Sequence, residues 1–316
     1  MPMELKRVCV IGGSGFVGGH VVHMLSAQRY QVQVPTRDRE RAKPLILLPT
    51  VDVVDANVHD TASLKQLLLG MDVVINLVGV LHDGRGERGF DKAHVELTRK
   101  IIAACADTGV RRYVHMSAVG ADVNGPSRYQ RTKGAAEALV RASNLDWTIF
   151  RPSVVFGYND RFLNMFAQLL RIMPVMFLAR PQARFQPVYV EDVAAAMVAA
   201  VDNRATYGKS YDLCGPRIYT LRELVAFVGT ATGNRRPIIG LGDALSYLQA
   251  LALELLPGKL MTRDNFHSMA VDNVSSAPFP FGMQPAALEA VAPVWLGIAS
   301  PRARYRAYRD HARRAA

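Results

Sequence analysis

Tyr129 and Lys133 lie four positions apart in the segment SRYQRTK, which spans residues 127 to 133. On a helix, this spacing places both side chains on one face, a single turn apart. A lysine ammonium within about 5 Å of a phenol favours the phenolate and lowers the phenol pKa from its ordinary value near 10. Such a tyrosine can exchange a proton with a substrate hydroxyl or carbonyl, so the pair is a candidate for acid–base catalysis.

The same two side chains also allow a structural interpretation. Lys133 can form an i, i+4 ion pair with Glu137, and Tyr129 can simply cover a bound nucleotide. Ser127 and Gln130 form an S-x-x-Q capping box, which predicts that a helix begins here. Because the spacing fits both interpretations, the elements that position the pair must decide between them.

The strongest motif is VCVIGGSGFVGGHVV at residues 8 to 22, where Gly12-x-x-Gly15-x-x-Gly18 lies between a predicted strand and a predicted helix. This is the context that a dinucleotide-binding fingerprint requires. Gly12 allows the tight turn, Gly15 lets the backbone approach the pyrophosphate, and Gly18 lets helix and strand pack closely. We expect the phosphates to be faced by the backbone N–H groups of Ser14, Gly15, Phe16 and Val17.

The choice of nucleotide is predicted from the end of the second strand, where NAD proteins usually carry an acidic residue for the ribose hydroxyls. Here the strand ends VPTRDRERAK, with Arg37 at that place. A guanidinium can pair with a 2′-phosphate, and the neighbouring Arg39 strengthens the local positive field. NADP(H) is therefore favoured. NAD(H) is the alternative, with Asp38 as the ribose ligand if the register differs by one residue.

Short β-branched runs alternate with helix-length segments through the first half of the chain, which indicates a parallel sheet with helices on both faces. The predicted fold class is α/β, a Rossmann-type doubly wound parallel sheet with a smaller, mostly helical C-terminal lobe. The predicted strands are Arg7–Ile11, Gln31–Thr36, Val51–Asp55, Asp72–Leu77, Arg112–Met116 and Trp147–Arg151. A helix at Glu191–Asp202 and a strand at Tyr211–Cys214 are expected to return the chain to the sheet.

These patterns divide the chain into two predicted parts. Residues 1–155 and 186–216 form the dinucleotide-binding Rossmann domain, and residues 156–185 and 217–316 form the smaller lobe, which binds a substrate or partner. The lobe includes the apolar stretch ALSYLQALALELLPG from Ala244. That stretch is too short to span a bilayer, and we expect a buried helix, with an interface or membrane-surface helix as the alternative.

Composition narrows the class of protein. Half of the 316 residues are hydrophobic, enough for a sizeable core, and no uncharged apolar run is long enough to span a membrane. The three cysteines lie far apart, which argues against a disulfide framework or a metal site and favours a reducing cytoplasm. We therefore expect a cytoplasmic protein without a bound metal.

The net charge of +11 is concentrated in part at the C-terminus, where the segment RARYRAYRDHARR at residues 302 to 314 holds six arginines and one aspartate. Such a tail can be solvated, or can bind an acidic membrane surface or a protein partner. No nucleic-acid-binding motif accompanies it, so no nucleic acid is expected as a partner.

With the glycine loop and the Tyr129–Lys133 pair in place, the chain resembles the extended or atypical branch of the short-chain dehydrogenase/reductase superfamily over nearly its whole length. RPSVVFG at 151–157 and PVYVEDVAAA at 187–196 support this resemblance. Further segments resemble the NADPH-binding accessory subunit of respiratory complex I and its bacterial relatives. They are INLVG at 75–79, SRYQRTKGAAE at 127–137, FGYNDRFLNMFA at 156–167, QPVYVEDV at 186–193 and MTRD at 261–264.

The resemblance implies roles for further residues. Ser117 matches a hydroxyl that orients the substrate oxygen beside Tyr129 and Lys133, and the same lysine binds the nicotinamide ribose. Asn57 and Val58 match the adenine side, although Asn57 replaces the more usual aspartate. The ribose and nicotinamide side is matched by Leu77, Val78 and Gly79, and the carboxamide contacts by Pro152 to Val155. Phe162, Asn164 and Phe166 belong to the subgroup signature without an assigned chemistry, and helix packing is their alternative role.

Two functions follow from these patterns. One is an NADP(H)-binding accessory or redox-sensing module, which docks on a respiratory or quinone-handling complex, peripheral to the inner membrane, through the C-terminal lobe and the arginine-rich tail. The other is an NADP(H)-dependent oxidoreductase, epimerase or dehydratase that acts on a small or isoprenoid, quinone-related substrate. The subgroup signature favours the first function, and the intact Ser–Tyr–Lys set favours the second.

Overall fold

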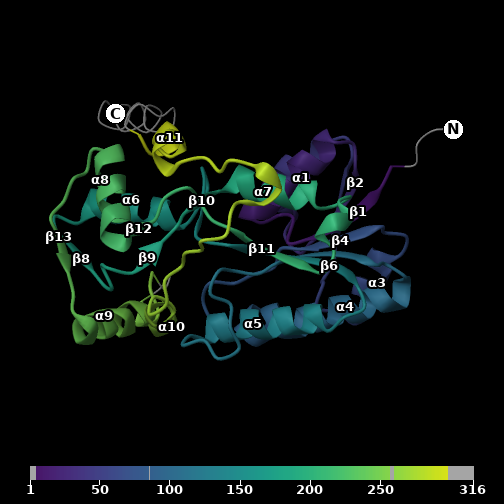
Figure 1. The fold of residues 1–316 in the computed structure, drawn as a ribbon, viewed down its shortest axis with the longest axis horizontal. Coiled ribbons are helices and arrows are strands. Elements are labelled where there is room, and N and C mark those ends of the chain that lie inside the picture. Colours follow the sequence, from purple (N-terminus) through teal and green to yellow (C-terminus); the bar gives the residue numbers. More distant parts are fainter. Residues whose placement is uncertain (1–4, 85, 257–259, 298–316) are drawn as a thin grey trace, which may run out of the picture. The chain divides into compact units, whose positions relative to one another are not determined.

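The computed structural model describes residues 5–84, 86–256 and 260–297. Seven parallel strands form one sheet in the order β11-β6-β5-β4-β1-β2-β3, the order of a doubly wound Rossmann fold (Figure 1). The strands are β1 (Arg7–Ile11), β2 (Gln31–Thr36), β3 (Val51–Asp55), β4 (Val73–Asn76), β5 (Arg112–Met116), β6 (Asp146–Pro152) and β11 (Lys209–Leu213). The predicted fold class is confirmed.

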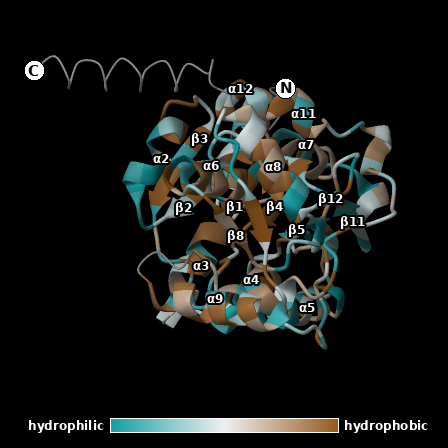
Figure 2. Ribbon diagram, turned by 90° about the vertical axis from the view of Figure 1, so that its left-hand side faces the viewer, coloured by the Kyte–Doolittle hydropathy of each residue, from teal (hydrophilic) through white to brown (hydrophobic). Residues whose placement is uncertain are grey.

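The strands read as apolar runs because both faces of the sheet are covered by helices. All four residues of β4 are buried, and the strands at the centre of the sheet are hydrophobic in Figure 2. The helices α3, α4 and α5 lie along one face, and α1 and α7 lie on the other (Figure 1). The helices of this unit are α1 (Phe16–Ala27), α2 (Arg39–Ile46), α3 (Thr61–Leu68), α4 (Leu97–Thr108), α5 (Arg128–Arg141) and α7 (Val190–Ala199). A π-helix, η2 (Asp91–Glu96), precedes α4, and short 3-10 helices lie at η1 (Gly86–Arg88), η3 (Arg204–Thr206) and η4 (Pro280–Gly282).

A single apolar cluster joins the sheet to α3, α4 and α5. Ile11, Leu64, Ile101 and Tyr113 are fully buried members of it. Cys105 belongs to the same cluster, and burial raises the pKa of its thiol to about 12, so the thiol stays protonated at neutral pH. This cluster fixes the sheet whose carboxyl edge carries the candidate site.

The chain divides into two compact units. The first holds the seven-stranded sheet and comprises Met1–Pro152, Val190–Leu213 and Ser275–Met283; the second comprises Ser153–Tyr189, Cys214–Val274 and the chain from Gln284. The helices of the second unit are α6 (Phe162–Ile172), α8 (Leu221–Ala231), α9 (Asp243–Leu255), α10 (Arg263–Ser268), α11 (Leu288–Val291) and α12 (Pro293–Leu296). Its two-stranded ladders pair β7 (Val155–Phe156) with β10 (Val188–Tyr189), β9 (Arg184–Phe185) with β12 (Tyr219–Thr220), and β8 (Met176–Leu178) with β13 (Ile238–Gly240).

The apolar stretch from Ala244 forms α9, but the expectation of a buried helix is wrong. Leu245, Leu248 and Leu255 are 57%, 58% and 81% exposed, and the two buried residues of the helix are Ser246 and Ala250. The exposed leucines recur at spacings of three and seven, which places them along one side of the helix. We call these three residues the leucine stripe. Its apolar pattern in the sequence therefore marks a surface and not a core.

No helix in the described part of the chain is long and apolar enough to cross a membrane. The arginine-rich segment at residues 302–314 lies outside the described residues, so its predicted contacts stay a prediction.

Candidate nucleotide-binding site

The glycine loop connects β1 to α1 at the carboxyl edge of the sheet. Gly12 has a φ of +86°, the left-handed conformation that glycine adopts without strain, and Gly15 donates its N–H to the Gly12 carbonyl at 3.0 Å. Helix α1 then begins at Phe16 with Gly15 as its N-cap and without a side chain capping it. The loop thus directs the backbone N–H groups of the first turn of α1 along the helix axis, as an anion-binding helix start requires.

Gly18 is the tightest position of the loop. A Cβ at this residue would lie 2.2 Å from the Gly12 carbonyl oxygen and 2.6 Å from the Gly13 Cα, distances that real Cβ atoms do not show. At Gly19, one residue further along α1, a Cβ would have open space around it. Close packing of α1 on the loop therefore depends on Gly18 and not on the general glycine content of the helix.

The other predicted phosphate-side residues lie where the motif places them along the chain. Ser14 Oγ is 3.3 Å from Thr36 Oγ1, which joins the glycine loop to the end of β2. Val17 is buried, and the Phe16 ring packs edge-on against His20 with the ring centroids 6.0 Å apart. Their side chains thus anchor the loop, which leaves the phosphate contacts to the backbone.

Two side chains hold the segment that follows β4, which is the predicted nicotinamide side. Asn76 Oδ1 accepts the Val78 N–H at 3.1 Å, and His94 Nε2 accepts the Val80 N–H at 3.2 Å. Leu77, which lies between Asn76 and Val78 in the chain, is buried, whereas Gly79 is exposed. The sequence analysis did not identify Asn76 or His94 as residues that hold this segment. Asn76 lies in the INLVG motif, which could have indicated its role.

The partners of His94 define its tautomer. Because Nε2 accepts the Val80 N–H, the proton lies on Nδ1, which donates to Thr132 Oγ1 at 2.9 Å, and that hydroxyl donates to the Tyr129 carbonyl at 3.1 Å. Burial lowers the pKa of His94 to about 2, and the Lys133 charge adds to this shift. A neutral histidine therefore ties the β4 segment to the first turns of α5.

Lys133 is buried and lies between two strand ends. Its Nζ donates to the Met116 carbonyl at 3.1 Å, and a Cβ at Gly79 would lie 3.2 Å from the same nitrogen. Burial lowers the pKa of the Lys133 ammonium to about 8, although the charge of Glu137 opposes the shift. The structure thus brings together the predicted residues Lys133 and Gly79, and the missing side chain of Gly79 leaves the space that the ammonium needs.

Tyr129 is set in an aromatic environment. Its ring lies edge-on to Phe90 and His94, with centroid distances of 5.8 and 5.6 Å. Burial raises the pKa of the Tyr129 phenol to about 12. This is the opposite of the lowering expected from a neighbouring lysine. At neutral pH Tyr129 is a protonated phenol, which can donate a hydrogen bond but is a poor general base.

The capping box that predicted the start of α5 is confirmed. Gln130 donates its N–H to Ser127 Oγ at 3.1 Å, and the Ser127 N–H donates to Gln130 Oε1 at 3.3 Å. The start of the helix fixes the positions of Tyr129 and Lys133 one turn apart. The placement of the pair is therefore a local consequence of the sequence.

Glu137 pairs with arginines and not with Lys133 as the structural interpretation proposed. Its Oε1 accepts the Arg151 Nε–H at 2.7 Å, and its Oε2 accepts from Arg151 and, at 3.3 Å, from Arg141. Burial raises the pKa of this carboxyl, but the hydrogen bonds from Arg151 and Arg141 and the charge of Arg151 outweigh it, and the net pKa is lowered. The Ser117 hydroxyl is buried and has no hydrogen-bond partner among the described residues, so its predicted orienting role stays a prediction.

At the other end of the carboxyl edge, Arg37 and Asn57 meet the same residue. Arg37 forms an ion pair with Glu87, and Asn57 Nδ2 donates to Glu87 Oε1 at 3.1 Å. The hydrogen bond from Asn57 lowers the pKa of Glu87, and the charges of His59 and Arg37 add to this effect. Sequence reasoning missed Glu87 because it lies thirty residues from Asn57 in a turn without a motif.

The remaining predicted residues have structural partners. Asp38 accepts the Arg41 N–H as the N-cap of α2, and Val58 packs against the core cluster of the first unit. The Pro152 carbonyl, at the end of β6, accepts the Val119 N–H at 3.0 Å. Val155 belongs to the second unit, where it pairs with Val188. Their predicted contacts with a nucleotide stay predictions.

The subgroup signature residues serve local structure in the second unit. The Phe162 ring lies edge-on to Phe166, with the ring centroids 5.3 Å apart, and Phe166 is buried in that unit's core. Asn164 Nδ2 donates to the Asp160 carbonyl at 2.9 Å. Thr262 of the MTRD segment caps α10. Helix packing and capping thus account for the contacts of these residues.

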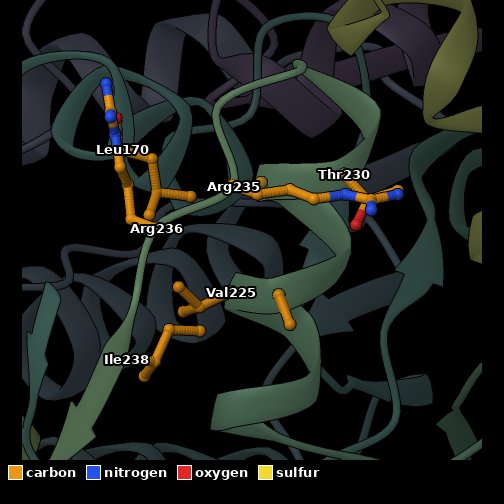
Figure 3. A pocket seen from close by; sticks show the side chains of 8 residues that line it. Leu170, Val225, Thr230, Arg235, Arg236 and Ile238 are labelled. Carbon is orange, nitrogen blue, oxygen red and sulfur yellow. The ribbon is translucent and has the colours of Figure 1, made fainter. Parts of the chain in front are cut away.

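A hollow of about 280 Å³ lies in the second unit (Figure 3). Val225 and Ile238 form an apolar side, and the Arg235 and Arg236 side chains point away in different directions. Arg236 Nε donates to the Leu170 carbonyl at 3.1 Å. No carboxylate, thiol or imidazole is among its lining residues, so this hollow offers no acid–base pair.

A second hollow, of about 570 Å³, lies in the first unit beside the edge strand β11. Tyr211 and Phe281 line it with aromatic rings whose centroids are 5.3 Å apart, and Arg151 contributes a charge. Neither Tyr129 nor Lys133 lines this hollow. The candidate pair therefore gains no substrate cavity from it.

Comparison with known proteins identifies the family. A family model described as NAD(P)H-binding matches residues 12–204. The chain belongs to the NAD(P)H-binding family. The predicted dinucleotide-binding function and the resemblance to the complex I subunit are confirmed.

This NAD(P)H-binding protein is similar to respiratory proteins. It is 36% identical over 223 residues to the mitochondrial NADH dehydrogenase (ubiquinone) 1 alpha subcomplex subunit 9 of Arabidopsis thaliana, a match that covers 68% of this chain and 55% of the plant protein. It is 27% identical over 285 residues to the 40 kDa subunit of the NADH-ubiquinone oxidoreductase of Neurospora crassa, covering 88% of this chain and 75% of the fungal protein. The chain thus spans little more than half the length of the plant relative.

The fold of the NAD(P)H-binding protein has solved counterparts. A nucleoside-diphosphate-sugar epimerase from Staphylococcus aureus superimposes with a TM-score of 0.72 at 19% identity, covering 90% of this chain and 98% of the epimerase. At this identity the likeness concerns the fold alone.

Proposed function

We propose that the protein holds NADP(H) as an accessory module of a respiratory complex, without turning the nucleotide over. The observation that carries the proposal is the pairing of the glycine loop at the start of α1 with the buried Lys133 between Gly79 and Met116. The loop supplies N–H groups for a pyrophosphate. Lys133 supplies an ammonium for the nicotinamide ribose, because its donor protons face the ends of β4 and β5.

The preference for NADP(H) rests on Arg37. It follows β2 directly, where the 2′ substituent of the adenosine ribose binds in this fold. Asp38, the alternative ribose ligand, already caps α2 and pairs with Arg41 at 3.1 Å. Arg37 is therefore the residue that offers a charge to a 2′-phosphate.

The protonated state of Tyr129 argues against turnover in the direction that needs a general base. A phenol with a pKa of about 12 is protonated at neutral pH, and it lies against Phe90 and His94. A general base works best with a pKa near the working pH, so this phenol is poorly matched to abstracting a proton from a substrate hydroxyl, the step that oxidation of a substrate by NADP+ requires. Its hydroxyl can still donate a hydrogen bond to the nicotinamide end of the nucleotide.

Calorimetric titration of the purified chain with NADPH and NADH tests the binding proposal. We expect both nucleotides to bind, NADPH more tightly, and Arg37→Gln to weaken NADPH about tenfold while changing NADH less than about twofold, because a charged contact contributes roughly 1.4 kcal/mol. Arg39→Gln is the matched control, since it removes the neighbouring charge. Equal loss of both nucleotides in Arg37→Gln contradicts the NADP(H) preference.

Docking on a respiratory complex, and hence a location at the inner membrane, is proposed from the leucine stripe of α9. Three leucines that are more than half exposed on one helix side form an apolar surface of the kind that partners cover. The relatives that carry a respiratory subunit's name support a partner of this class. The arginine-rich segment at residues 302–314 adds charge for an acidic surface.

Co-purification tests the docking proposal. Leu248→Gln is expected to release the protein from respiratory complexes that are isolated from the source cells. Leu47→Gln, at a position that is 85% exposed in the first unit, is the matched control and should leave the association intact. If both variants co-purify as the unchanged protein does, the leucine stripe is not the docking surface.

A further inference from the structure

Both carboxylate oxygens of Glu87 contact residues on the predicted adenosine side of the nucleotide site. Oε2 pairs with Arg37, and Oε1 accepts the Asn57 Nδ2–H at 3.1 Å. The two partners come from the ends of neighbouring strands, since Arg37 follows β2 and Asn57 follows β3. The carboxylate of Glu87 therefore bridges the two strand ends at which the adenosine ribose of a dinucleotide binds in this fold.

The orientation of the Asn57 amide is fixed by a third contact. Asn57 Oδ1 accepts the His59 N–H at 3.0 Å, so Nδ2 is the atom that remains to face Glu87. Had the amide been reversed, its oxygen would repel the carboxylate. An asparagine fits this bridge, whereas an aspartate at this position would place a second negative charge against Glu87.

Two further basic residues lie near Glu87. His59 influences the pKa of Glu87, although burial lowers the pKa of the His59 imidazole itself, and Lys100 Nζ donates to the His59 carbonyl at 2.6 Å. Arg37 is 53% and Glu87 35% exposed at the side chain. Solvent thus reaches the pair, and a ligand can displace one partner without opening the core.

We propose that Glu87 is a specificity-determining residue, a carboxylate of the protein itself that competes with a 2′-phosphate for Arg37. This inference rests on the proposed binding of NADP(H). A 2′-phosphate carries about −1.5 to −2 charges, so it binds Arg37 only when Glu87 gives up its ion pair and moves away. NADH lacks that phosphate and leaves the ion pair in place. Glu87 therefore lowers the affinity for NADPH but not for NADH. It reduces the preference for NADPH over NADH that Arg37 creates.

The occurrence of the asparagine at position 57 follows from the same proposal. With its amide donating to Glu87, Asn57 keeps the carboxylate ionised and aligned between the strands. Its role is to position Glu87, and it need not contact the nucleotide.

Titration of Glu87→Gln with NADPH and NADH tests the proposal. The glutamine keeps the size of the side chain and removes its charge. We expect the Kd for NADPH to fall about fivefold, the factor that corresponds to roughly 1 kcal/mol for a solvent-exposed ion pair, while the Kd for NADH changes less than about twofold. Glu40→Gln is the matched control. Glu40 pairs with Lys43 on helix α2, which follows Arg37 in the chain, so this substitution also removes one negative charge near Arg37.

The double variant Arg37→Gln/Glu87→Gln completes a mutant cycle. Competition for Arg37 requires that Glu87→Gln has no effect on NADPH binding once Arg37 is absent. A fivefold gain that persists in the double variant overturns the proposal, since it reports general charge repulsion. An equal gain for NADH and NADPH in the single variant, or a gain of the same size in Glu40→Gln, overturns it as well.

The proposed function fails in a different way. If neither nucleotide binds to the unchanged protein, then NAD(P)H holding by this chain is contradicted. If both bind and Glu87→Gln leaves the NADPH affinity unchanged, the binding function stands and the role of Glu87 falls. Without nucleotide, Glu87→Gln should unfold at a slightly lower temperature than the unchanged protein, because the variant lacks the ion pair with Arg37.

Discussion

The two ends of the candidate nucleotide site differ in burial and in charge. At the nicotinamide end, Lys133 is the one charged residue beside the neutral side chains of His94 and Asn76. All three are buried and form hydrogen bonds to backbone groups. The adenosine end is half-exposed and ionic, with Arg37 and Glu87 paired at the surface. Both lie along the carboxyl edge of one parallel sheet.

The difference separates affinity from selectivity. At the buried end, contacts are fixed before a ligand arrives, so changes there affect every nicotinamide nucleotide alike. At the exposed end, two side chains of opposite charge can exchange partners with a ligand, so changes there distinguish a phosphorylated from an unphosphorylated ribose. The glycine loop follows β1, which lies between β4 and β2 in the sheet, so a change in the loop should affect the binding of both nucleotides.

The largest effect is expected at that loop. Gly18→Ala places a Cβ 2.2 Å from the Gly12 carbonyl, so we expect a loss of about 3 kcal/mol in the free energy of unfolding and a loss of both NADPH and NADH binding. Gly19→Ala is the matched control, because its Cβ meets open space, and it should raise the stability by up to about 1 kcal/mol. Chemical denaturation and nucleotide titration check both; normal nucleotide binding by Gly18→Ala would refute the packing argument.

The next largest effect concerns the charge at the buried end. Lys133→Met removes a charged hydrogen-bond donor, so NADPH and NADH should both bind at least about tenfold more weakly. Because burial lowers the pKa of Lys133 to about 8, a ligand that needs the ammonium must take up a proton above that pH. The affinity of the unchanged protein should therefore fall as the pH rises through 8, while that of Lys133→Met stays flat.

The same pKa has a consequence for stability. Without ligand, the unfolded chain holds the Lys133 proton up to its ordinary pKa of 10.5, whereas the folded chain releases it near 8. The unfolded state binds more protons between these two values, so the contribution of Lys133 to folding becomes more favourable as the pH rises through this window. Lys133→Met should lack that rise in urea-unfolding experiments. An unchanged pH profile in the variant would show that the lysine is not desolvated.

The sequence was sufficient for the sheet and for the start of α5. The predicted strand ranges Arg7–Ile11 and Gln31–Thr36 are found residue for residue, because buried parallel strands are apolar runs bounded by turn residues. The capping box at Ser127 was equally local. By contrast, α9 has an apolar sequence but an exposed surface, since burial depends on what the rest of the chain leaves uncovered.

The candidate site was predictable only where chemistry follows a short motif. The glycines and Lys133 have such motifs, whereas Glu87 and His94 gain their roles from contacts with residues far away in the chain. The direction of the Tyr129 pKa was missed for a related reason. A pairwise rule counts the charge of a lysine, but the burial that outweighs it is set by the packing around the ring.

The smallest effect sharpens the contrast between the two ends. His94→Leu leaves the Val80 N–H without its acceptor, so we expect a loss of about 1–2 kcal/mol in stability and a twofold to fivefold weaker binding of both nucleotides, in equal measure. His23→Leu, at an exposed position of α1, is a control. Selective loss of NADPH in His94→Leu would contradict the separation of affinity from selectivity.

Whether the bound nucleotide is held or consumed is decided most directly by the fate of NADPH on the purified chain. NADPH fluorescence can be followed after carbonyl and quinone compounds are added to the loaded protein and to its Tyr129→Phe variant. We expect the bound NADPH to stay reduced in both proteins, at the same slow rate of loss. Oxidation by the unchanged protein that disappears in Tyr129→Phe would contradict the account and establish an enzyme.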